Sequence, residues 1–320
     1  MMDTIIIDGL AFALPLFIMA IGGIYSERSG IINLAIEGLQ GFGAFTGALF
    51  VVTIAHFTGA DVQNLSYLAF LFAMIGGALY AVVHALLCVK FRANQVISGV
   101  VINILAMALT GFLTTQINAV AFGNVSDRFQ LGVSNRFTIP LLSEIPIVGA
   151  IFRSVYPFEI IIIVIAIIAY YILYRTKYGL RLRACGDNPH AVDAAGGNVS
   201  KIRFRAVMLS GAFAGLGGMC FAYSISANFS PAIYLGYGYL AIAALIFGNW
   251  EITSTFFACL LFGLARSGGY ALAQRLEMSS AVTDLTMILP YVLTLLLLIF
   301  FSKSNRAPRA LGEVYDKGKR

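Results

Sequence analysis

The chain has 320 residues, of which 59% are hydrophobic and only 11% are charged, and its mean hydropathy is +0.87. Soluble domains carry roughly 25% charged residues, so this composition excludes a soluble protein. A helix needs roughly 20 apolar residues to cross a bilayer, and the chain therefore predicts an all-α, polytopic transmembrane helical bundle of about 8–10 spans, without room for a large soluble domain.

Apolar runs between polar breaks predict where the spanning helices lie. They cover residues 4–24, 36–56, 65–89, 95–118, 158–174, 205–228, 237–248, 253–272 and 281–301. The amino terminus has no basic stretch, carries Asp3 and Asp8 and leads straight into the first run, so we expect it to be retained as a helix and not cleaved as a signal peptide. The run 237–248 is short and bracketed by glycines, which favours half of a broken helix.

Lysine and arginine are divided unevenly between alternate connections. Of the 21, sixteen fall at Arg28, at Lys90 and Arg92, in the segment 175–205 or after Phe301. The positive-inside rule places this group in the cytoplasm and the amino terminus outside. The net charge of +6 is thus an orientation signal, and nucleic-acid binding is not expected. Residues 1–302 are expected to form the transmembrane domain, and residues 303–320 a basic, solvated cytoplasmic tail.

Two connections are long. The external one, residues 119–157, contains three prolines and two apolar stretches, a pattern typical of a folded cap or interfacial helix that an external partner can contact. The cytoplasmic one, residues 175–205, predicts a short helix that is capped by Asn188, begins at Pro189 and ends at Gly196. Basic residues flank it on both sides, so it is either a docking helix at headgroup level or an ordinary basic loop.

Polar side chains within the spans are candidates for a transport pathway. Asn33 and Glu37 are four residues apart and are expected on one helix face. Glu37 either contacts substrate hydroxyls, acts as a gate, or bonds to Arg28 or to the backbone of a neighbouring helix. Asn103 either lines the pathway or makes an interhelical hydrogen bond, and Asn94 is expected to cap its helix.

Aromatic side chains gather in the segment 228–240. Their faces can stack on a nucleobase, or they anchor the protein at the membrane interface. Arg266 and Asp284 either snorkel to the outer surface or line the passage. The candidate pathway residues are Asn33, Glu37, Asn103, Phe229, Tyr234, Tyr237 and Tyr239.

Catalytic and metal motifs are not found in the sequence. The three histidines have no metal-ligand spacing, and the glycine pairs are not followed by the lysine of a phosphate-binding loop. The four scattered cysteines are expected to be buried apolar residues. We therefore predict no catalytic residue, no metal site and no ATP hydrolysis by the chain alone.

Four segments together resemble the signature blocks of bacterial ABC-transporter permeases: SERSGIINLAIEGLQGFGAF (26–45), ANQVISGVVINILA (93–106), LRACGDNPHAVDAAGGNVSKIRFRAVMLSGAFAGLGG (182–218) and YLGYGYLAIAALIFGNW (234–250). The resemblance is to the branched-chain amino acid and simple-sugar permease superfamily, and within it most closely to the purine nucleoside permeases. It implies a fold like that of type II ABC importers and a permease subunit that passes purine nucleosides through the bacterial inner membrane.

The resemblance also implies partners. These are two ATPase subunits that bind ATP and Mg, a second permease subunit of the same or a different sequence, an external substrate-binding lipoprotein and membrane lipid; the chain itself binds no cofactor. The segment 182–205 corresponds to the family's ATPase-coupling segment. Its residues are Gly186, Asp187, Asn188, Pro189, Ala191, Asp193, Ala194 and Gly196. The alternatives are a permease for simple sugars or branched-chain amino acids, and an ion-coupled secondary transporter with Glu37 or Asp284 as the coupling carboxylate.

Overall fold

The computed structural model describes residues 2–318 apart from 133, 146–148, 233–235, 280–285, 287 and 302–305. Its long helices are α1 (Met2–Arg28), α2 (Ile36–Thr58), α3 (Ser66–Ala85), α4 (Gln95–Ala121), α5 (Pro157–Arg175), α8 (Val199–Phe221) and α10 (Ile252–Arg275). The shorter helices are α6 (Lys177–Asp187), α7 (Pro189–Ala194), α9 (Tyr237–Phe247) and α12 (Leu289–Phe301). In the described residues, seven helices are long and apolar enough to cross a membrane.

Short elements complete the chain. The π-helical turns η2 (Leu86–Lys90) and η5 (Ala222–Ser226) extend α3 and α8. The 3-10 turns η1 (Val62–Leu65), η3 (Leu142–Glu144) and η4 (Gly149–Phe152) lie in connections. Two short strands, β1 (Phe129–Gln130) and β2 (Asn228–Phe229), pair antiparallel.

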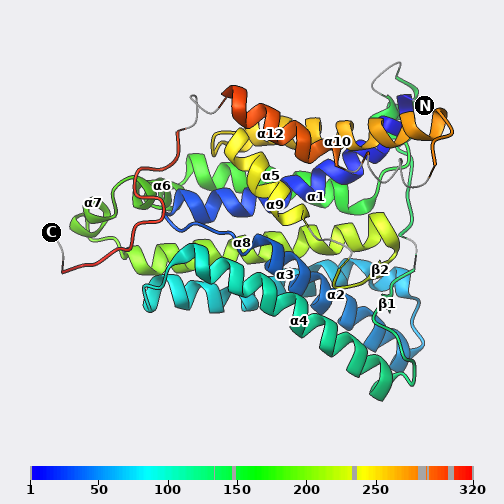
Figure 1. Ribbon diagram of the computed structural model, residues 1–320, viewed down its shortest axis with the longest axis horizontal. Coiled ribbons are helices and arrows are strands. Elements are labelled where there is room, and N and C mark those ends of the chain that lie inside the picture. The colour runs from blue at the N-terminus through cyan, green and yellow to red at the C-terminus, as the bar shows by residue number, and fades with distance from the viewer. Residues whose placement is uncertain are drawn as a thin grey trace.

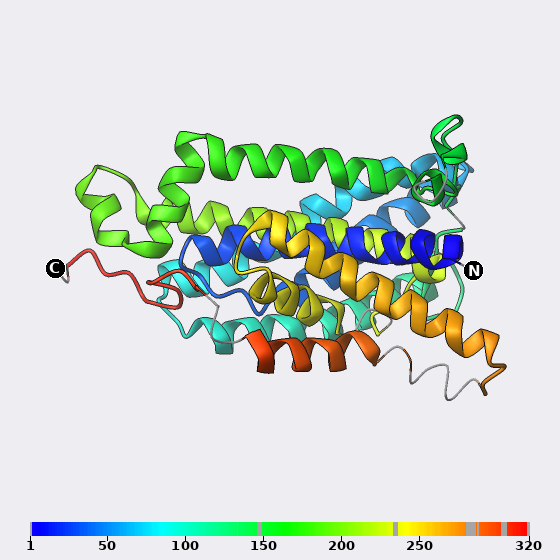
Figure 2. The same ribbon diagram turned by 90° about the horizontal axis from the view of Figure 1, so that it is seen from above.

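The spanning helices run along the long axis of the molecule (Figure 1). The amino terminus lies at one end, where Asp3 and Asp8 form ion pairs with Arg153 and Arg136. The opposite end carries α6, α7 and the C-terminal tail, as the view from above also shows (Figure 2). The basic residues assigned to the cytoplasm and those assigned to the outside therefore lie at opposite ends of the bundle, as the positive-inside rule requires.

Helix α8 lies in the core and packs closely against α1, α2 and α3. Glycines allow this contact: a Cβ atom at Gly43 of α2 would collide with the Cα atom of Gly215 on α8 and with the carbonyl of Ala73 on α3. Helices in lipid associate through such close backbone approaches. By contrast, α4 and α5 expose apolar side chains, with Ile97, Ile104 and Ile167 each more than 60% exposed, which suits lipid or another membrane chain.

The structure corrects one local expectation and favours one of two alternatives for another segment. Helix α2 begins at Ile36, so Asn33 precedes it and does not share a helix face with Glu37. In the connection 119–157, expected to be a folded cap or an interfacial helix, the described residues form β1, η3 and η4, as in a folded cap. Three expectations are confirmed: α9 is short, the side chain of Asn94 caps α4 by accepting from the amides of Val96 and Ile97, and Asn188 caps α7.

The C-terminal tail is also more ordered than expected. Residues 306–318 cross the end of the bundle that carries α6 and α7 (Figure 1). The amide of Ala310 donates to the carbonyl of Gly186, and the amide of Gly312 to the carbonyl of Gly30. Buried Arg203 donates from Nη1 to the carbonyl of Glu313 at 2.8 Å. We call residues 306–318 the strap, because they tie α6, α8 and the end of α1 together.

Candidate substrate pathway and coupling surface

The connection between α1 and α2 is non-helical backbone inside the bundle, and side chains from α4 and α8 satisfy its polar groups. Gln95 of α4 accepts from the amide of Ile32 at 2.7 Å, and Asn103 donates to the carbonyl of Leu34 at 2.8 Å. The carbonyl of Ser29 accepts from Arg203. Such backbone is tolerated at membrane depth only where protein groups or water replace its lost hydrogen bonds. Three of the four signature segments thus meet at residues 29–35.

The carboxylate of Glu37 holds the beginning of α9. Its Oε1 accepts from the amide of Gly236 at 2.6 Å, and its Oε2 accepts from the amide of Gly238 at 2.7 Å. Gln40 donates to the same carboxylate at 3.1 Å. A negative charge at a helix amino terminus is favourable because the free amides and the helix dipole point towards it. Of the roles open to Glu37, the bond to the backbone of a neighbouring helix is present here, and a contact with substrate stays a prediction.

Asn103 joins three elements at the same level of the bundle. Its Oδ1 accepts from the amide of Gly38 at 2.7 Å, and its Nδ2 donates to the hydroxyl of Tyr239 at 2.9 Å in addition to Leu34. Asn103 therefore ties α4 to both α2 and α9. We call Glu37, Asn103 and Tyr239 the inner joint, because together they fix where α9 meets the rest of the bundle.

A small cavity of about 30 Å³ lies beside the inner joint, lined by Glu37, Gly38, Asn103 and Thr110 among others. Binding sites for small organic molecules usually measure about 300–1,000 Å³. This conformation is therefore closed to a nucleoside at the inner joint. Passage of such a substrate requires α9 to move away from α4, or a second chain to complete a wider path.

The remaining pathway candidates lie farther from this joint. Phe229 is fully buried in β2 and packs against Phe45 and Phe129. Tyr237 packs edge-on against Phe12, with ring centroids 5.2 Å apart. Asn33 donates to the hydroxyl of Ser210 at 2.8 Å. Tyr234 and Asp284 lie outside the described residues. The structure thus brings Glu37, Asn103 and Tyr239 together and places Asn33, Phe229 and Tyr237 in separate contacts.

A second, outer cavity was not predicted from the sequence. It has a volume of about 330 Å³ and is lined by Asp8, Phe12, Arg136, Arg266 and Tyr270 among others. The guanidinium of Arg266 lies over the ring of Phe12, 4.6 Å from its centroid. These residues are distant in sequence, so no motif could have revealed the cavity. Within the described residues, no three His, Cys, Asp or Glu side chains are placed to hold a metal ion.

The short helix α7 forms an exposed knob of small residues at the strap end of the molecule. Ala191, Ala194 and Gly196 are exposed, whereas Pro189 is buried and anchors the helix. Gly196 has a φ of 77°, the left-handed conformation that was expected where α7 ends. Gly186 is buried, and a Cβ atom there would collide with the carbonyl of Arg28, so it holds α6 against α1. Of the eight coupling candidates, the three small exposed residues and the exposed Asp187 and Asn188 are open to a partner.

The α9–α10 turn is fastened to the same end of α1. Trp250 donates from Nε1 to the carboxylate of Glu27 at 2.5 Å, and its carbonyl accepts from Nε of Arg28 at 3.0 Å. Both Asn249 and Trp250 have a φ of 56°, a conformation that non-glycine residues rarely adopt. Adjacent Glu27 and Arg28 cannot pair with each other along a helix, and they instead hold Trp250 between them.

Residues 5–298 match the family described as "Branched-chain amino acid transport system / permease component". The chain belongs to this permease family. The permease is 40% identical to the guanosine ABC transporter permease protein NupQ of Bacillus subtilis, over 97% of this chain and 96% of that protein. It is 37% identical to the nucleoside ABC transporter permease protein NupC of Lactococcus lactis, over 99% and 98% of the two chains.

A more distant relative carries a different substrate in its name. The permease is 32% identical to the putative glucose ABC transporter permease protein TsgC13 of Haloferax volcanii, over 79% of this chain and 72% of that protein. The family expected from the four signature segments is therefore confirmed, and the chain is a multi-pass membrane permease subunit of an ABC transporter.

Proposed function

We propose that this permease is the membrane subunit of an ATP-driven importer that carries purine nucleosides across the cytoplasmic membrane of a bacterium. The observation that carries the proposal is the similarity over almost the full length of both chains to permeases named for guanosine and for nucleosides. The glucose permease matches less of its own length at lower identity, so a sugar is the weaker alternative.

Separate ATPase subunits supply the energy, and α7 is where they act on this chain. A knob of small side chains fits a groove in another protein with little conformational entropy to lose. A second permease subunit packs beside this one in the membrane, and an external lipoprotein delivers the nucleoside at the end that carries the amino terminus. The exposed apolar sides of α4 and α5 leave ample surface for the second subunit and for lipid.

A continuous series of contacts leads from α7 to the inner joint. Helix α6 precedes α7 directly and packs through Gly186 on the carbonyl of Arg28. Arg28 and Glu27 hold Trp250, which follows α9 in the chain. Helix α9 begins at the carboxylate of Glu37. We infer that displacement of α7 by the ATPase moves α9 relative to α4 through these contacts.

Opening of the inner joint exposes groups suited to a nucleoside. Separation of α9 from α4 breaks the hydrogen bond between Asn103 and Tyr239 and frees an amide donor and a phenol. An amide and a hydroxyl can bond to the base edge or the ribose hydroxyls, and the ring of Tyr239, which is 46% exposed, offers a face for stacking. Transport needs a different affinity in each conformation and no chemical step.

Uptake in proteoliposomes tests this function. The permease is reconstituted with its ATPase subunits, its permease partner and its binding protein, and entry of radiolabelled guanosine is followed with ATP on the cytoplasmic side. We expect uptake that requires ATP and is reduced by excess adenosine or inosine but not by glucose or leucine. Competition by glucose or leucine would assign a different substrate class, and uptake driven by a proton or sodium gradient without ATP would refute the importer.

A further inference from the structure

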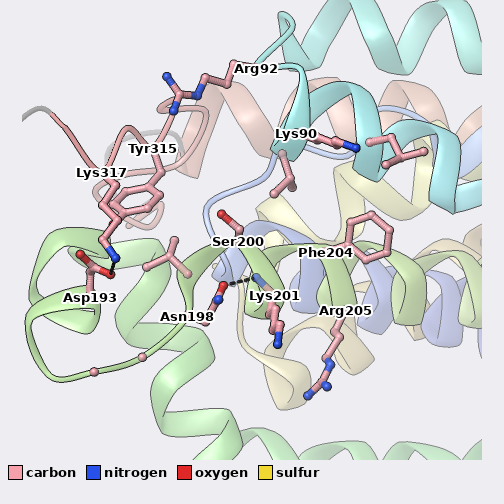
Figure 3. A pocket seen from close by; sticks show the side chains of 15 residues that line it. Lys90, Arg92, Asp193, Asn198, Ser200, Lys201, Phe204, Arg205, Tyr315 and Lys317 are labelled. Atoms are coloured by element: carbon pink, nitrogen blue, oxygen red, sulfur yellow. Dashed lines mark hydrogen bonds and ion pairs between the residues drawn. The ribbon is translucent and has the colours of Figure 1, made fainter.

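The largest cavity described here lies at the strap end of the molecule, outside the proposed pathway. It has a volume of about 780 Å³ and is formed by three separate stretches of chain (Figure 3). These are η2 with Arg92 just after it, the turn from α7 into the first helical turns of α8, and the strap. None of its side chains belongs to the inner joint.

Positive charge dominates the lining of this cavity. Five cationic side chains, Lys90, Arg92, Lys201, Arg205 and Lys317, and a single carboxylate, Asp193, line it. Lys317 lies 3.8 Å from Asp193, and Arg92 pairs with Asp316 of the strap at 3.1 Å. Within the described part of the chain, Lys90, Lys201 and Arg205 make no salt bridge. Three positive charges around one cavity are thus left without a counter-charge.

One wall of the same cavity is apolar. Leu86, Val89 and Phe204 line it, and all three are partly exposed. This wall continues along α3 towards Val83 and Leu79, which are 41% and 61% exposed and face outward from the bundle. The cavity therefore combines a cationic rim, at the end where spanning helices leave the membrane, with an apolar surface that leads back into it.

We propose that this cavity binds the phosphate of an anionic phospholipid from the cytoplasmic leaflet, with an acyl chain along Phe204 and the outer face of α3. Lys90, Lys201 and Arg205 line the cavity at separate points (Figure 3) and together attract the phosphate through their positive charge, and Leu86 and Val89 contact the glycerol and the first methylenes. A free phosphate compound can pair with the cationic side chains of the rim, but it leaves the apolar wall exposed to water. That exposure costs free energy in proportion to the apolar area. The proposal does not depend on which substrate the permease carries.

The test compares lipid binding to the full-length permease and to two triple variants. The first variant is Lys90→Gln, Lys201→Gln and Arg205→Gln. The second, Arg175→Gln, Lys177→Gln and Arg181→Gln, removes the same charge at the same end but outside the cavity. Binding of phosphatidylglycerol and of phosphatidylcholine to detergent-purified protein is measured by native mass spectrometry.

We expect phosphatidylglycerol to bind the unmodified permease and the second variant at least about tenfold more tightly than phosphatidylcholine, and this preference to be lost in the first variant. Each basic residue near an anionic lipid surface contributes about fivefold to the binding affinity, so the loss of three such residues is large enough to measure. A Phe204→Asn variant, which keeps the charges, should weaken phosphatidylglycerol but not glycerophosphate. Equal preference in both triple variants would overturn the proposal.

Two further arms identify the source of the phosphate. If millimolar inorganic phosphate or glycerophosphate displaces phosphatidylglycerol completely, the cavity is a site for soluble phosphate, and the lipid assignment is wrong. If the first variant keeps its lipid preference but loses affinity for the ATPase subunits, the cations contact protein, and the lipid assignment is again wrong. Circular dichroism and thermal unfolding of each variant establish that it is folded.

Discussion

The amide of Asn103 is hydrogen-bonded to the hydroxyl of Tyr239 at 2.9 Å, although 136 residues separate them in the sequence. Within the described residues it is the only side-chain hydrogen bond between α4 and α9, and it lies beside the carboxylate that holds α9. The relative position of α4 and α9 at the inner joint therefore depends on very few groups.

A double-mutant cycle tests whether this bond opens during transport. Asn103→Ala and Tyr239→Phe each remove one partner, and an interhelical hydrogen bond in a membrane protein contributes about 0.6–2 kcal/mol. If the bond stabilises only the closed state, each single variant should shift the permease towards the open state, and the double variant should shift it no further. The distance between spin labels on α4 and α9 measures this population. Additive shifts would show that the two residues act independently.

The Glu37→Gln substitution tests the attachment of α9. The amide keeps an acceptor oxygen but loses the negative charge that faces the amides of Gly236 and Gly238, and charge-assisted bonds are worth about 1.5–3 kcal/mol. We expect lower thermal stability and slower uptake that still depends on ATP. A Gln40→Leu variant, which removes the longest of these three bonds to the carboxylate, at 3.1 Å, and keeps the charge of Glu37, should have a smaller effect. Loss of gradient-driven uptake in Glu37→Gln would instead support a coupling carboxylate.

Two glycines of α2 form a matched pair for testing the packing of the core. A Cβ atom at Gly43 would collide with the backbone of Gly215, whereas one at Gly41 meets nothing within 4 Å. We expect Gly43→Ala to destabilise the permease by about 1–3 kcal/mol through overpacking, and Gly41→Ala to be neutral or slightly stabilising because alanine favours helix. Thermal unfolding in detergent measures both, and equal effects would contradict the close packing of α2 on α8.

A bulky residue on α7 tests the coupling surface. Ala191→Trp places an indole on the exposed face of the knob, while Leu180→Trp places one on α6, where the native side chain is already 61% exposed. We expect Ala191→Trp to abolish the stimulation of ATPase activity by substrate-loaded binding protein, and Leu180→Trp to preserve it. Membrane insertion of both should be normal. Full stimulation in Ala191→Trp would show that the ATPase docks elsewhere.

Cys185 reports on the strap through its reactivity. The thiol lies on α6 next to Gly186, and burial raises its pKa to about 11. A raised thiol pKa means that the reactive thiolate is scarce at pH 8 and becomes abundant only as the pH approaches 11. In a variant with the other three cysteines replaced by alanine, alkylation at pH 8 should therefore be slow. Glycine substitutions at Tyr315 and Leu311, which loosen the strap, should accelerate alkylation several-fold. An unchanged rate would mean that the strap does not cover α6.

Much of the fold could be predicted from the sequence because lipid imposes a simple rule on helix length and charge. Seven of the nine predicted spans, the two groups of basic residues and the capped helix α7 follow from local patterns, and the structure agrees with them. The predicted span 281–301 lies partly outside the described residues. Asn103 was identified by its depth in a span, and its inward bonds follow from the cost of an unpaired amide in lipid.

Other features depend on contacts between distant segments. Asn33 lies outside α2 because the side chains of Gln95, Asn103 and Arg203 form hydrogen bonds with the backbone of residues 29–35. Local helix propensity cannot predict hydrogen bonds between segments so far apart in the sequence. The strap was expected to be solvated because its composition is polar and basic. Two charges of the strap, on Asp316 and Lys317, are in fact paired with Arg92 and Asp193. The outer cavity likewise requires residues from α1, α10 and the connection after β1.

The attachment of the strap also sets an order for assembly. Arg203 belongs to the middle of the chain, yet one of its buried donors finds an acceptor only at Glu313. During synthesis this donor therefore stays hydrated until the strap, 110 residues later in the chain, has left the ribosome. The end of the bundle that carries α7 therefore closes only after the strap has been made, so that a chain interrupted before Glu313 leaves this donor of Arg203 exposed to water.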